Sequence, residues 1–123
     1  MNDSSRAEIR NAVVLIPAYN PADELVLLVR ELKNSFKRIV VVDDGSQTGL
    51  ENFDKVVALG AELLRHDVNK GKGAALKTGF QYIGEEDVVT ADADGQHKAE
   101  STRRPYPWRP FLLLLLFSAK CLF

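Results

Sequence analysis

Two carboxylates separated by a single residue are the clearest chemical feature of this sequence. The apolar stretch 88–91 runs into Asp92, Ala93 and Asp94. Because side chains two residues apart point to the same side of an extended chain, Asp92 and Asp94 can aim at one point beyond the end of a strand. Two anionic oxygens placed in this way suit a hard divalent cation such as Mg²⁺ or Mn²⁺. Asp and Gly also form polar turns, so the stretch by itself supports a turn equally well.

Composition narrows the classes of protein that this chain can be. Its 123 residues are the length of one ordinary domain with a single core. A net charge of −1 gives no broad basic face, so we expect no nucleic-acid partner. One Cys and two His exclude a disulfide framework and a Cys-rich zinc site. The polar start, residues 1–10, lacks the apolar core of a signal peptide, so we expect a cytoplasmic protein.

The elements that must position these carboxylates alternate between strand and helix patterns. Short, continuous apolar runs are typical of strands buried on both faces of a parallel sheet. Apolar residues at helical spacing separate these runs, and Asn20 and Pro21 suit the N-cap and the first position of the first helix. This alternation predicts an α/β fold, a parallel sheet with helices on both faces. The predicted strands are residues 12–16, 39–42, 61–65 and 87–91, and the helical patterns are residues 25–36, 50–57 and 71–83.

Polar and glycine-rich segments follow the carboxyl end of every predicted strand. They are residues 17–20, 43–46, 66–71 and 92–97. The carboxyl ends of parallel strands lie along one edge of the sheet, and ligands of open α/β sheets bind in the crevice at that edge. We therefore expect these four loops to form one binding site.

Several familiar motifs are nearly matched and fail. The segment 71–78 resembles a P-loop, but Leu76 stands where the second Gly is required, and a dinucleotide fingerprint fails at the same residue. These failures argue against an NTPase and against a nicotinamide-dependent dehydrogenase. A calcium-binding loop around Asp92 would need an acidic side chain at Thr90 and a Glu at Ser101, and the sequence has neither.

Four motifs, taken in order, resemble those of the family-2 glycosyltransferases. The nearest branch contains dolichol-phosphate mannosyltransferase and the polyprenyl-phosphate glucosyltransferases, and the similarity covers about residues 12–100. It implies a Rossmann-like GT-A half-domain that binds a nucleotide sugar, with inverting transfer from a UDP- or GDP-sugar. The motifs are IPAYN (16–20), VDDGS (42–46), NKGKGAAL (69–76) and DADGQH (92–97).

The resemblance also implies which residues bind the donor. The first loop would line the nucleoside pocket, Asp43 and Asp44 would hydrogen-bond the base or ribose, and Lys70 would begin the turn near the donor. Pro21 replaces the acidic residue that often follows this Tyr-Asn pair, which leaves the choice of base open. The implied nucleotide-binding residues are Pro17, Ala18, Tyr19, Asn20, Asp43, Asp44, Lys70, Gly71 and Ala93, and the implied metal ligands are Asp92, Asp94 and Gln96.

The implied metal is Mg²⁺ or Mn²⁺, held on the diphosphate of the donor. Breaking the sugar–phosphate bond leaves negative charge on the departing nucleoside diphosphate, and the cation would neutralise that charge as a Lewis acid. Lys70 or Lys72 could assist. His66 is interpreted as structural and His97 as passive.

The resemblance ends near Glu100, where the composition changes. We interpret residues 1–11 as a polar lead and residues 12–100 as a partial GT-A domain. Residues 101–123 are interpreted as a tail outside the fold, rich first in Pro and Arg and then in Leu, as a shifted reading frame would produce. Its apolar block, residues 111–117, is shorter than the roughly 20 residues needed to span a bilayer. A membrane-surface anchor is the alternative interpretation of this tail.

Family members carry the general base in an acceptor-binding half that follows this region. We therefore identify no catalytic residue in this chain and expect slow turnover or none. The implied acceptor is a polyprenyl or dolichyl phosphate, or another glycan acceptor, which would place the full-length relative at the cytosolic face of a membrane. Two alternatives stay open: a non-catalytic fragment that binds metal and nucleoside diphosphate, and an inert partial domain whose last strand has an unpaired edge.

Overall fold

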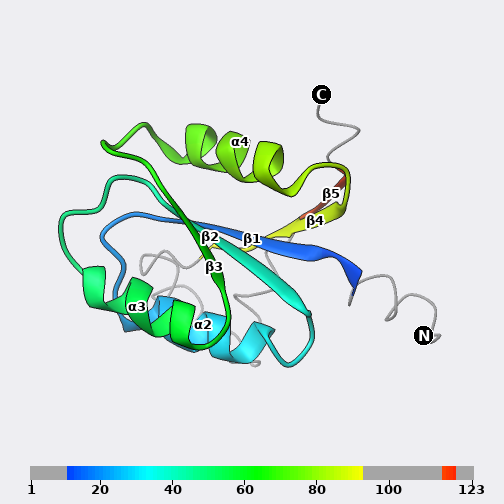
Figure 1. Cartoon of the computed structure of the whole chain (residues 1–123), viewed down its shortest axis with the longest axis horizontal. Helices are drawn as coiled ribbons and strands as arrows, with labels where there is room; N and C mark the ends of the chain where they lie inside the picture. Colours follow the sequence, from blue (N-terminus) through cyan, green and yellow to red (C-terminus); the bar gives the residue numbers. More distant parts are fainter. Residues whose placement is uncertain (1–10, 93–114, 119–123) are drawn as a thin grey trace, which may run out of the picture.

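A twisted sheet with helices on both faces forms the fold. In this computed structural model the described residues are 11–92 and, for the backbone alone, 115–118. The sheet has the order β3-β2-β1-β4-β5, with α2 and α3 on one face and α4 on the other (Figure 1). The predicted parallel sheet with helices on both faces is confirmed for β1 to β4. The elements are β1 (Val13–Ala18), α2 (Asp23–Leu32), β2 (Arg38–Asp43), α3 (Leu50–Ala58), β3 (Glu62–Arg65), α4 (Lys72–Ile83), β4 (Asp87–Thr90) and β5 (Leu115–Ser118).

The strand β1 lies at the centre of this sheet. Its neighbours β2 and β4 both run parallel to it, and β3 runs parallel to β2. All six residues of β1 are buried, as its continuous apolar run predicts. The chain passes outward from β1 to β2 and β3, and α4 then crosses the other face to bring β4 to the far side of β1. The direction of strand addition therefore reverses at β1.

Alternate residues of β1 belong to two separate cores. Val14 and Ile16 pack in the core beneath α2 and α3, whereas Val13 and Leu15 pack in the core beneath α4. Because side chains along a strand alternate between faces, a strand that is apolar throughout needs helices on both sides. The apolar stripe predicted over residues 25–36 is buried in the first core, which confirms its burial. The helix itself is shorter than predicted, because α2 ends at Leu32 and Phe36 lies beyond it.

The helix α3 is covered less fully than its predicted pattern suggests. Phe53 and Val56 are fully buried, but Leu50 and Val57 are 44% and 46% exposed. The helix packs against α2 and the short edge strand β3, so only the side that carries Phe53 and Val56 meets the core.

Pro17 ends the hydrogen bonding between β1 and β4. The sequence predicts that the first strand stops before Pro17, yet β1 continues to Ala18 by pairing with β2. On the other side of β1, the amide of Ala91 donates to the carbonyl of Leu15 (3.0 Å). The next bond of this parallel ladder would need an N–H at residue 17 toward the carbonyl of Ala91, and proline has none. The ladder therefore stops just before Asp92.

A short stretch of the tail belongs to the sheet. The strand β5 pairs antiparallel with β4, from Asp87 opposite Ser118 to Thr90 opposite Leu115. The expectations that the tail lies outside the fold and that the last strand has an unpaired edge therefore do not hold for residues 115–118. An outer strand presents N–H and C=O groups that need partners, and an apolar segment can supply them. The rest of the tail lies outside the described residues. Within the described part of the chain, no helix is long and apolar enough to cross a membrane.

Gly79 marks a close approach of α4 to β1, where a side chain has no room. A Cβ atom at this position would lie 2.2 Å from Cδ1 of Leu15, which is fully buried. We expect Gly79→Ala to lower the free energy of unfolding by about 1–3 kcal/mol, because overpacking outweighs the better helix propensity of Ala. Urea unfolding followed by circular dichroism measures this change.

Gly73→Ala is the matched control in the same helix, because nothing lies within 4 Å of a Cβ atom there. This variant should keep the stability of the wild type or gain up to about 1 kcal/mol. Equal stability of the Gly79→Ala variant and the wild type would contradict the packing argument.

Candidate functional site

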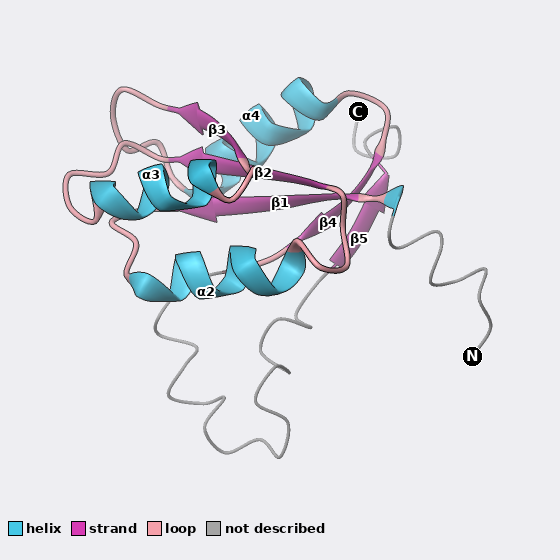
Figure 2. Cartoon of the chain, turned by 60° about the horizontal axis from the view of Figure 1, so that its bottom comes forward, coloured by secondary structure: helices cyan, strands magenta, loops and turns pink. Residues whose placement is uncertain are grey.

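The loops that follow β1, β2 and β3 meet at one edge of the sheet. Ala18, Asp43 and Arg65 are the last residues of these strands and lie in register with one another. The amide of Asp44 donates to the carbonyl of Ala18 (2.9 Å), and the amide of His66 donates to the carbonyl of Asp43 (2.8 Å). Figure 2 shows these loops at the left-hand end of the sheet. The predicted gathering of the first three loops is therefore confirmed.

Gly45 allows the backbones of two of these loops to touch. Its φ is +74°, and a Cβ atom there would lie 2.3 Å from the carbonyl carbon of Val68 and 2.4 Å from the nitrogen of Asn69. Only glycine suits both the left-handed backbone and this close approach. The glycine of the VDDGS motif therefore brings the loop after β2 against the loop after β3.

Asn20 joins the loop after β1 to the loop after β2. Its backbone N–H donates to Oγ of Ser46 (2.8 Å), and its side-chain Oδ1 accepts from the backbone N–H groups of Gln47 (2.8 Å) and Thr48 (3.1 Å). Its φ of +48° is left-handed, a conformation that Asn tolerates better than most residues. The predicted N-cap role is wrong, because α2 begins only at Asp23. A role of Asn20 in nucleotide binding stays a prediction.

Asp43 is a buried carboxylate at this edge, with only 3% of the residue exposed. Its Oδ1 accepts from the amide of Ser46 (2.8 Å), and its Oδ2 lies 3.5 Å from Nε of Arg65. The Arg65 side chain is half exposed, and its guanidinium carbon lies 6.0 Å from the centre of the Phe53 ring. Sequence reasoning missed Arg65. Its signal is its position, because it ends β3 directly opposite Asp43.

Asp44 is equally buried, and its carboxylate accepts four hydrogen bonds. Nδ1 of His66 (2.8 Å) and the amide of Lys70 (2.9 Å) bond Oδ1. The amide of Gly71 (2.8 Å) and Nδ2 of Asn69 (3.0 Å) bond Oδ2. A carboxylate has about four lone-pair positions, so these donors occupy the whole acceptor capacity of Asp44. Its predicted contact with the nucleotide stays a prediction, while these bonds tie the loop after β3 to the end of β2.

Burial and hydrogen bonding act in opposite directions on the pKa of Asp44. Burial raises the pKa, whereas the hydrogen bonds from the amide of Lys70, the His66 ring and the amide of Gly71 lower it. The net result is a pKa below the ordinary value for this carboxyl group. Asp44 is therefore ionised at neutral pH.

His66 is buried between Asp44 and α4, in agreement with the structural role expected from the sequence. Its side chain is only 7% exposed, and both ring nitrogens have partners: Nδ1 bonds Asp44, and Nε2 lies 2.7 Å from Oγ1 of Thr78 in α4. The sequence gives no periodic signal for this pair of contacts.

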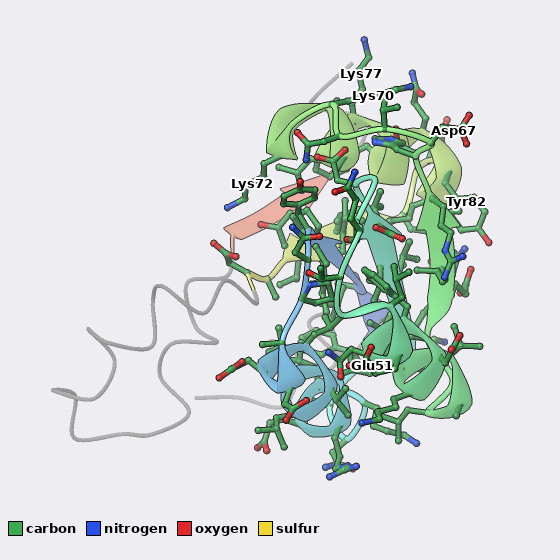
Figure 3. All side chains as sticks on the ribbon, turned by 90° about the vertical axis from the view of Figure 1, so that its left-hand side faces the viewer. Glu51, Asp67, Lys70, Lys72, Lys77 and Tyr82 are labelled. Atoms are coloured by element: carbon green, nitrogen blue, oxygen red, sulfur yellow. The ribbon has the colours of Figure 1, made fainter. Side chains whose placement is uncertain are left out.

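Asp92 follows β4, and a hydrogen bond from Lys72 connects it to the start of α4 at the same edge of the sheet. Nζ of Lys72, from the first turn of α4, donates to Oδ2 of Asp92 (3.0 Å). Their side chains are 60% and 20% exposed, respectively. In Figure 3, Lys72 projects toward the side of β4, whereas Lys70 and Lys77 project away from the sheet. Lys72, one of the two lysines expected to assist, therefore contacts the predicted metal ligand Asp92.

The chemistry of Asp92 fits a role in holding a divalent cation. Its Oδ2 already accepts a hydrogen bond from the ammonium group of Lys72, so this carboxylate sits next to a positive charge. The other implied ligands, Asp94 and Gln96, and the implied nucleotide-binding Ala93 lie outside the described residues. Among the residues that the structure describes, no group of three or more His, Cys, Asp or Glu side chains gathers in a way that would hold a metal.

The remaining predicted residues all lie at the carboxyl end of β1. Pro17 and Ala18 are buried, so they can offer a ligand little more than backbone. Tyr19 is 50% exposed and presents an aromatic ring at this edge.

Comparison with known proteins points to one family. Residues 13–104 match the model of glycosyl transferase family 2. A Methanococcus voltae protein named UDP-N-acetylglucosamine–dolichyl-phosphate N-acetylglucosaminyltransferase is 32% identical over 108 residues, and the match covers 68% of this chain and 41% of that protein. An uncharacterized protein of Methanocaldococcus jannaschii is 33% identical over 108 residues, with 85% of this chain and 42% of that protein covered. The chain thus spans less than half the length of these curated relatives.

The fold is also similar to solved structures. A mannosyltransferase from Pyrobaculum calidifontis in complex with GDP-mannose and Mn²⁺ superposes with a TM-score of 0.59 at 24% identity. The similarity covers 68% of this chain and 27% of that one. At this level of identity the match bears on the fold, and it confirms the expected Rossmann-like GT-A architecture for this part of the chain.

The buried charge of Asp44 predicts an acid-dependent loss of stability. Asp44→Asn places amide hydrogens against donors, and we expect it to lower the free energy of unfolding by about 2 kcal/mol or more at neutral pH. Because the folded-state pKa lies below the ordinary value of 3.8, this advantage of the wild type is fully present above that value. It is lost as the pH falls through the folded-state pKa. Urea unfolding of both proteins at about pH 7, 5 and 3 tests this dependence.

Asp54→Asn, on the exposed side of α3, is the control and should stay within about 0.5 kcal/mol of the wild type. A difference between Asp44→Asn and the wild type that is the same at all three pH values would contradict the proposed role of the ionised carboxylate.

Proposed function

The chain belongs to glycosyl transferase family 2, and we propose that the edge formed by the loops after β1 to β4 binds the nucleotide-sugar donor. One observation carries this proposal. The loops after β1, β2 and β3 are hydrogen-bonded to one another, and Lys72 links the end of the third loop to Asp92 after β4. Ligands of open α/β sheets bind at such an edge, where the strand order reverses.

The donor is a UDP- or GDP-sugar. Asp43 is the carboxylate that would accept hydrogen bonds from the base or ribose, because only part of its acceptor capacity is used by Ser46. The exposed ring of Tyr19 would cover one face of the nucleoside. The names of the similar proteins support both bases, since one relative is named for a UDP-sugar and the Pyrobaculum enzyme was solved with GDP-mannose.

The diphosphate end of the donor would lie near Asp92 and Lys72. Asp92, with Asp94 and Gln96, would hold Mg²⁺ or Mn²⁺ on the diphosphate, as the Mn²⁺ in the Pyrobaculum complex supports. When bound, the cation supplies Lewis-acid stabilisation of the charge on the departing nucleoside diphosphate. The ammonium of Lys72 adds a second positive charge next to the same carboxylate. Lys72 would thus help to hold the diphosphate oxygens as the sugar–phosphate bond breaks.

The acceptor is a lipid phosphate of the polyprenyl or dolichyl type, at the cytosolic face of a membrane. The support is the Methanococcus voltae relative, which is named for transfer to dolichyl phosphate. Deprotonation of an acceptor needs a base, and the described residues of this edge offer no carboxylate that we assign to that role.

Titration with nucleotides tests this proposal directly. We expect UDP or GDP to bind the chain more tightly in the presence of Mn²⁺, as measured by calorimetry. Asp92→Asn should weaken the metal-dependent binding about tenfold or more, because it removes an anionic ligand. The base that binds also decides between the two classes of donor.

Asp67→Asn is the matched control, because Asp67 is an exposed carboxylate in the loop after β3. It should bind nucleotide as the wild type does. Equal affinity of the wild type and Asp92→Asn would remove Asp92 from the metal site. Binding without any sugar transfer to a polyprenyl phosphate would identify the chain as a binding fragment.

A further inference from the structure

A continuous set of hydrogen bonds runs from the middle of α4 to the loop that begins this helix. Oγ1 of Thr78 lies 2.7 Å from Nε2 of His66, and Nδ1 of His66 lies 2.8 Å from Oδ1 of Asp44. Asp44 in turn accepts from the amides of Lys70 and Gly71. The side chains of His66 and Asp44 are 7% and 4% exposed, so the two central groups of this set are shielded from water.

The chemistry of these groups leaves one arrangement of protons for a neutral imidazole. An ionised carboxylate only accepts, so Nδ1 of His66 must carry the hydrogen that bonds Asp44. Nε2 then has a lone pair, which accepts from the hydroxyl of Thr78. The ring is therefore held at both ends in one tautomer and one orientation.

This arrangement acts on the candidate site through the start of α4. Gly71 precedes the helix with a φ of +101°, and its carbonyl accepts from the amide of Ala75 in the first turn. Lys72 follows directly and donates to Asp92. A shift of Asp44 would move the amides of Lys70 and Gly71, and with them the base of the Lys72 side chain.

We propose that His66 is a positioning residue. Anchored to Thr78 by one ring nitrogen, it holds the Asp44 carboxylate with the other, and Asp44 in turn holds the loop 69–71 and Lys72 in the position in which they contact the diphosphate of the donor. This inference rests on the proposed function, because it states that these hydrogen bonds affect the binding of the nucleotide-sugar donor. A buried histidine with only a structural role would affect stability alone. A positioning role changes nucleotide affinity in a protein that is still fully folded.

Two substitutions at His66 separate its two contacts. In His66→Asn, the side-chain NH₂ group takes a position close to that of Nδ1 in His. This variant therefore retains a donor for Asp44 and loses the contact with Thr78. The amide of Gln lies close to where Nε2 lies, so His66→Gln does the opposite. We expect His66→Gln to weaken Mn²⁺-dependent binding of UDP or GDP about tenfold, and His66→Asn to weaken it less.

Thr78 gives a second, gentler pair of variants. Thr78→Val removes the hydroxyl at nearly constant shape, and it should weaken nucleotide binding several-fold. Thr78→Ser keeps the hydroxyl and should restore wild-type affinity. Calorimetry is done at a temperature at which circular dichroism finds every variant folded, and if a His66 variant does not fold, the Thr78 pair decides. Unchanged affinity in the folded variants would overturn the inference.

Nuclear magnetic resonance supplies a readout that does not depend on nucleotide. The chain has only two histidines, so ¹⁵N spectra of the imidazoles are simple, and His97→Gln identifies the signals of His66. We expect the hydrogen on Nδ1 of His66 at neutral pH. A hydrogen on Nε2 alone would contradict the proposed hydrogen bond from His66 to Asp44 and overturn the inference. If the wild type binds neither nucleotide, the proposed function fails and this inference with it. If the wild type binds and all folded variants bind equally, only this inference fails.

Discussion

The buried carboxylate of Asp44 is the constraint on which the arrangement of this edge depends. Removing a charge from water is costly unless donors replace the lost hydration. Here three of the four donors come from residues 69–71 and the fourth from His66. The loop after β3 cannot move away without leaving an ionised group buried and unsatisfied. Its position, and that of the helix start that follows it, is therefore determined by the end of β2.

Two backbone features open the edge beside this fixed loop. The strand order reverses at β1, so the chain leaves β1 toward β2 on one side and returns to β4 on the other. Pro17 then lacks the N–H that would continue the β1–β4 ladder beyond Ala91. The segments that carry Tyr19 and Asp92 are thus not hydrogen-bonded to each other as strands at the point where the strand order reverses. Open α/β sheets bind their ligands at this point.

The sequence predicted those parts of the structure that depend on local patterns. Continuous apolar runs identified the four parallel strands, and alternation with helices correctly placed the loops after the first three of them at one edge. The contacts of Asn20 were not predictable, because a local preference for N-caps says nothing of partners 26 to 28 residues away. The contacts of His66 were not predictable for the same reason, since its partners follow β2 and lie in α4. Arg65 could have been found from its position, because it ends β3 opposite Asp43. The strand β5 was missed because a change of composition does not prevent an apolar segment from pairing with a sheet edge.

Three aspartates at this edge show how environment divides one residue type among different tasks. Asp44 has its acceptor capacity filled by protein donors, so it holds structure. Asp43 gives one oxygen to Ser46 and turns the other toward the half-exposed Arg65, 3.5 Å away, which leaves it room to accept from a ligand. Asp92 meets the ammonium of Lys72, a flexible and exposed cation that can move when another positive charge binds. Asp44 therefore has no acceptor position left for a ligand, which is why we assign the proposed donor contacts to Asp43 and the proposed metal contact to Asp92.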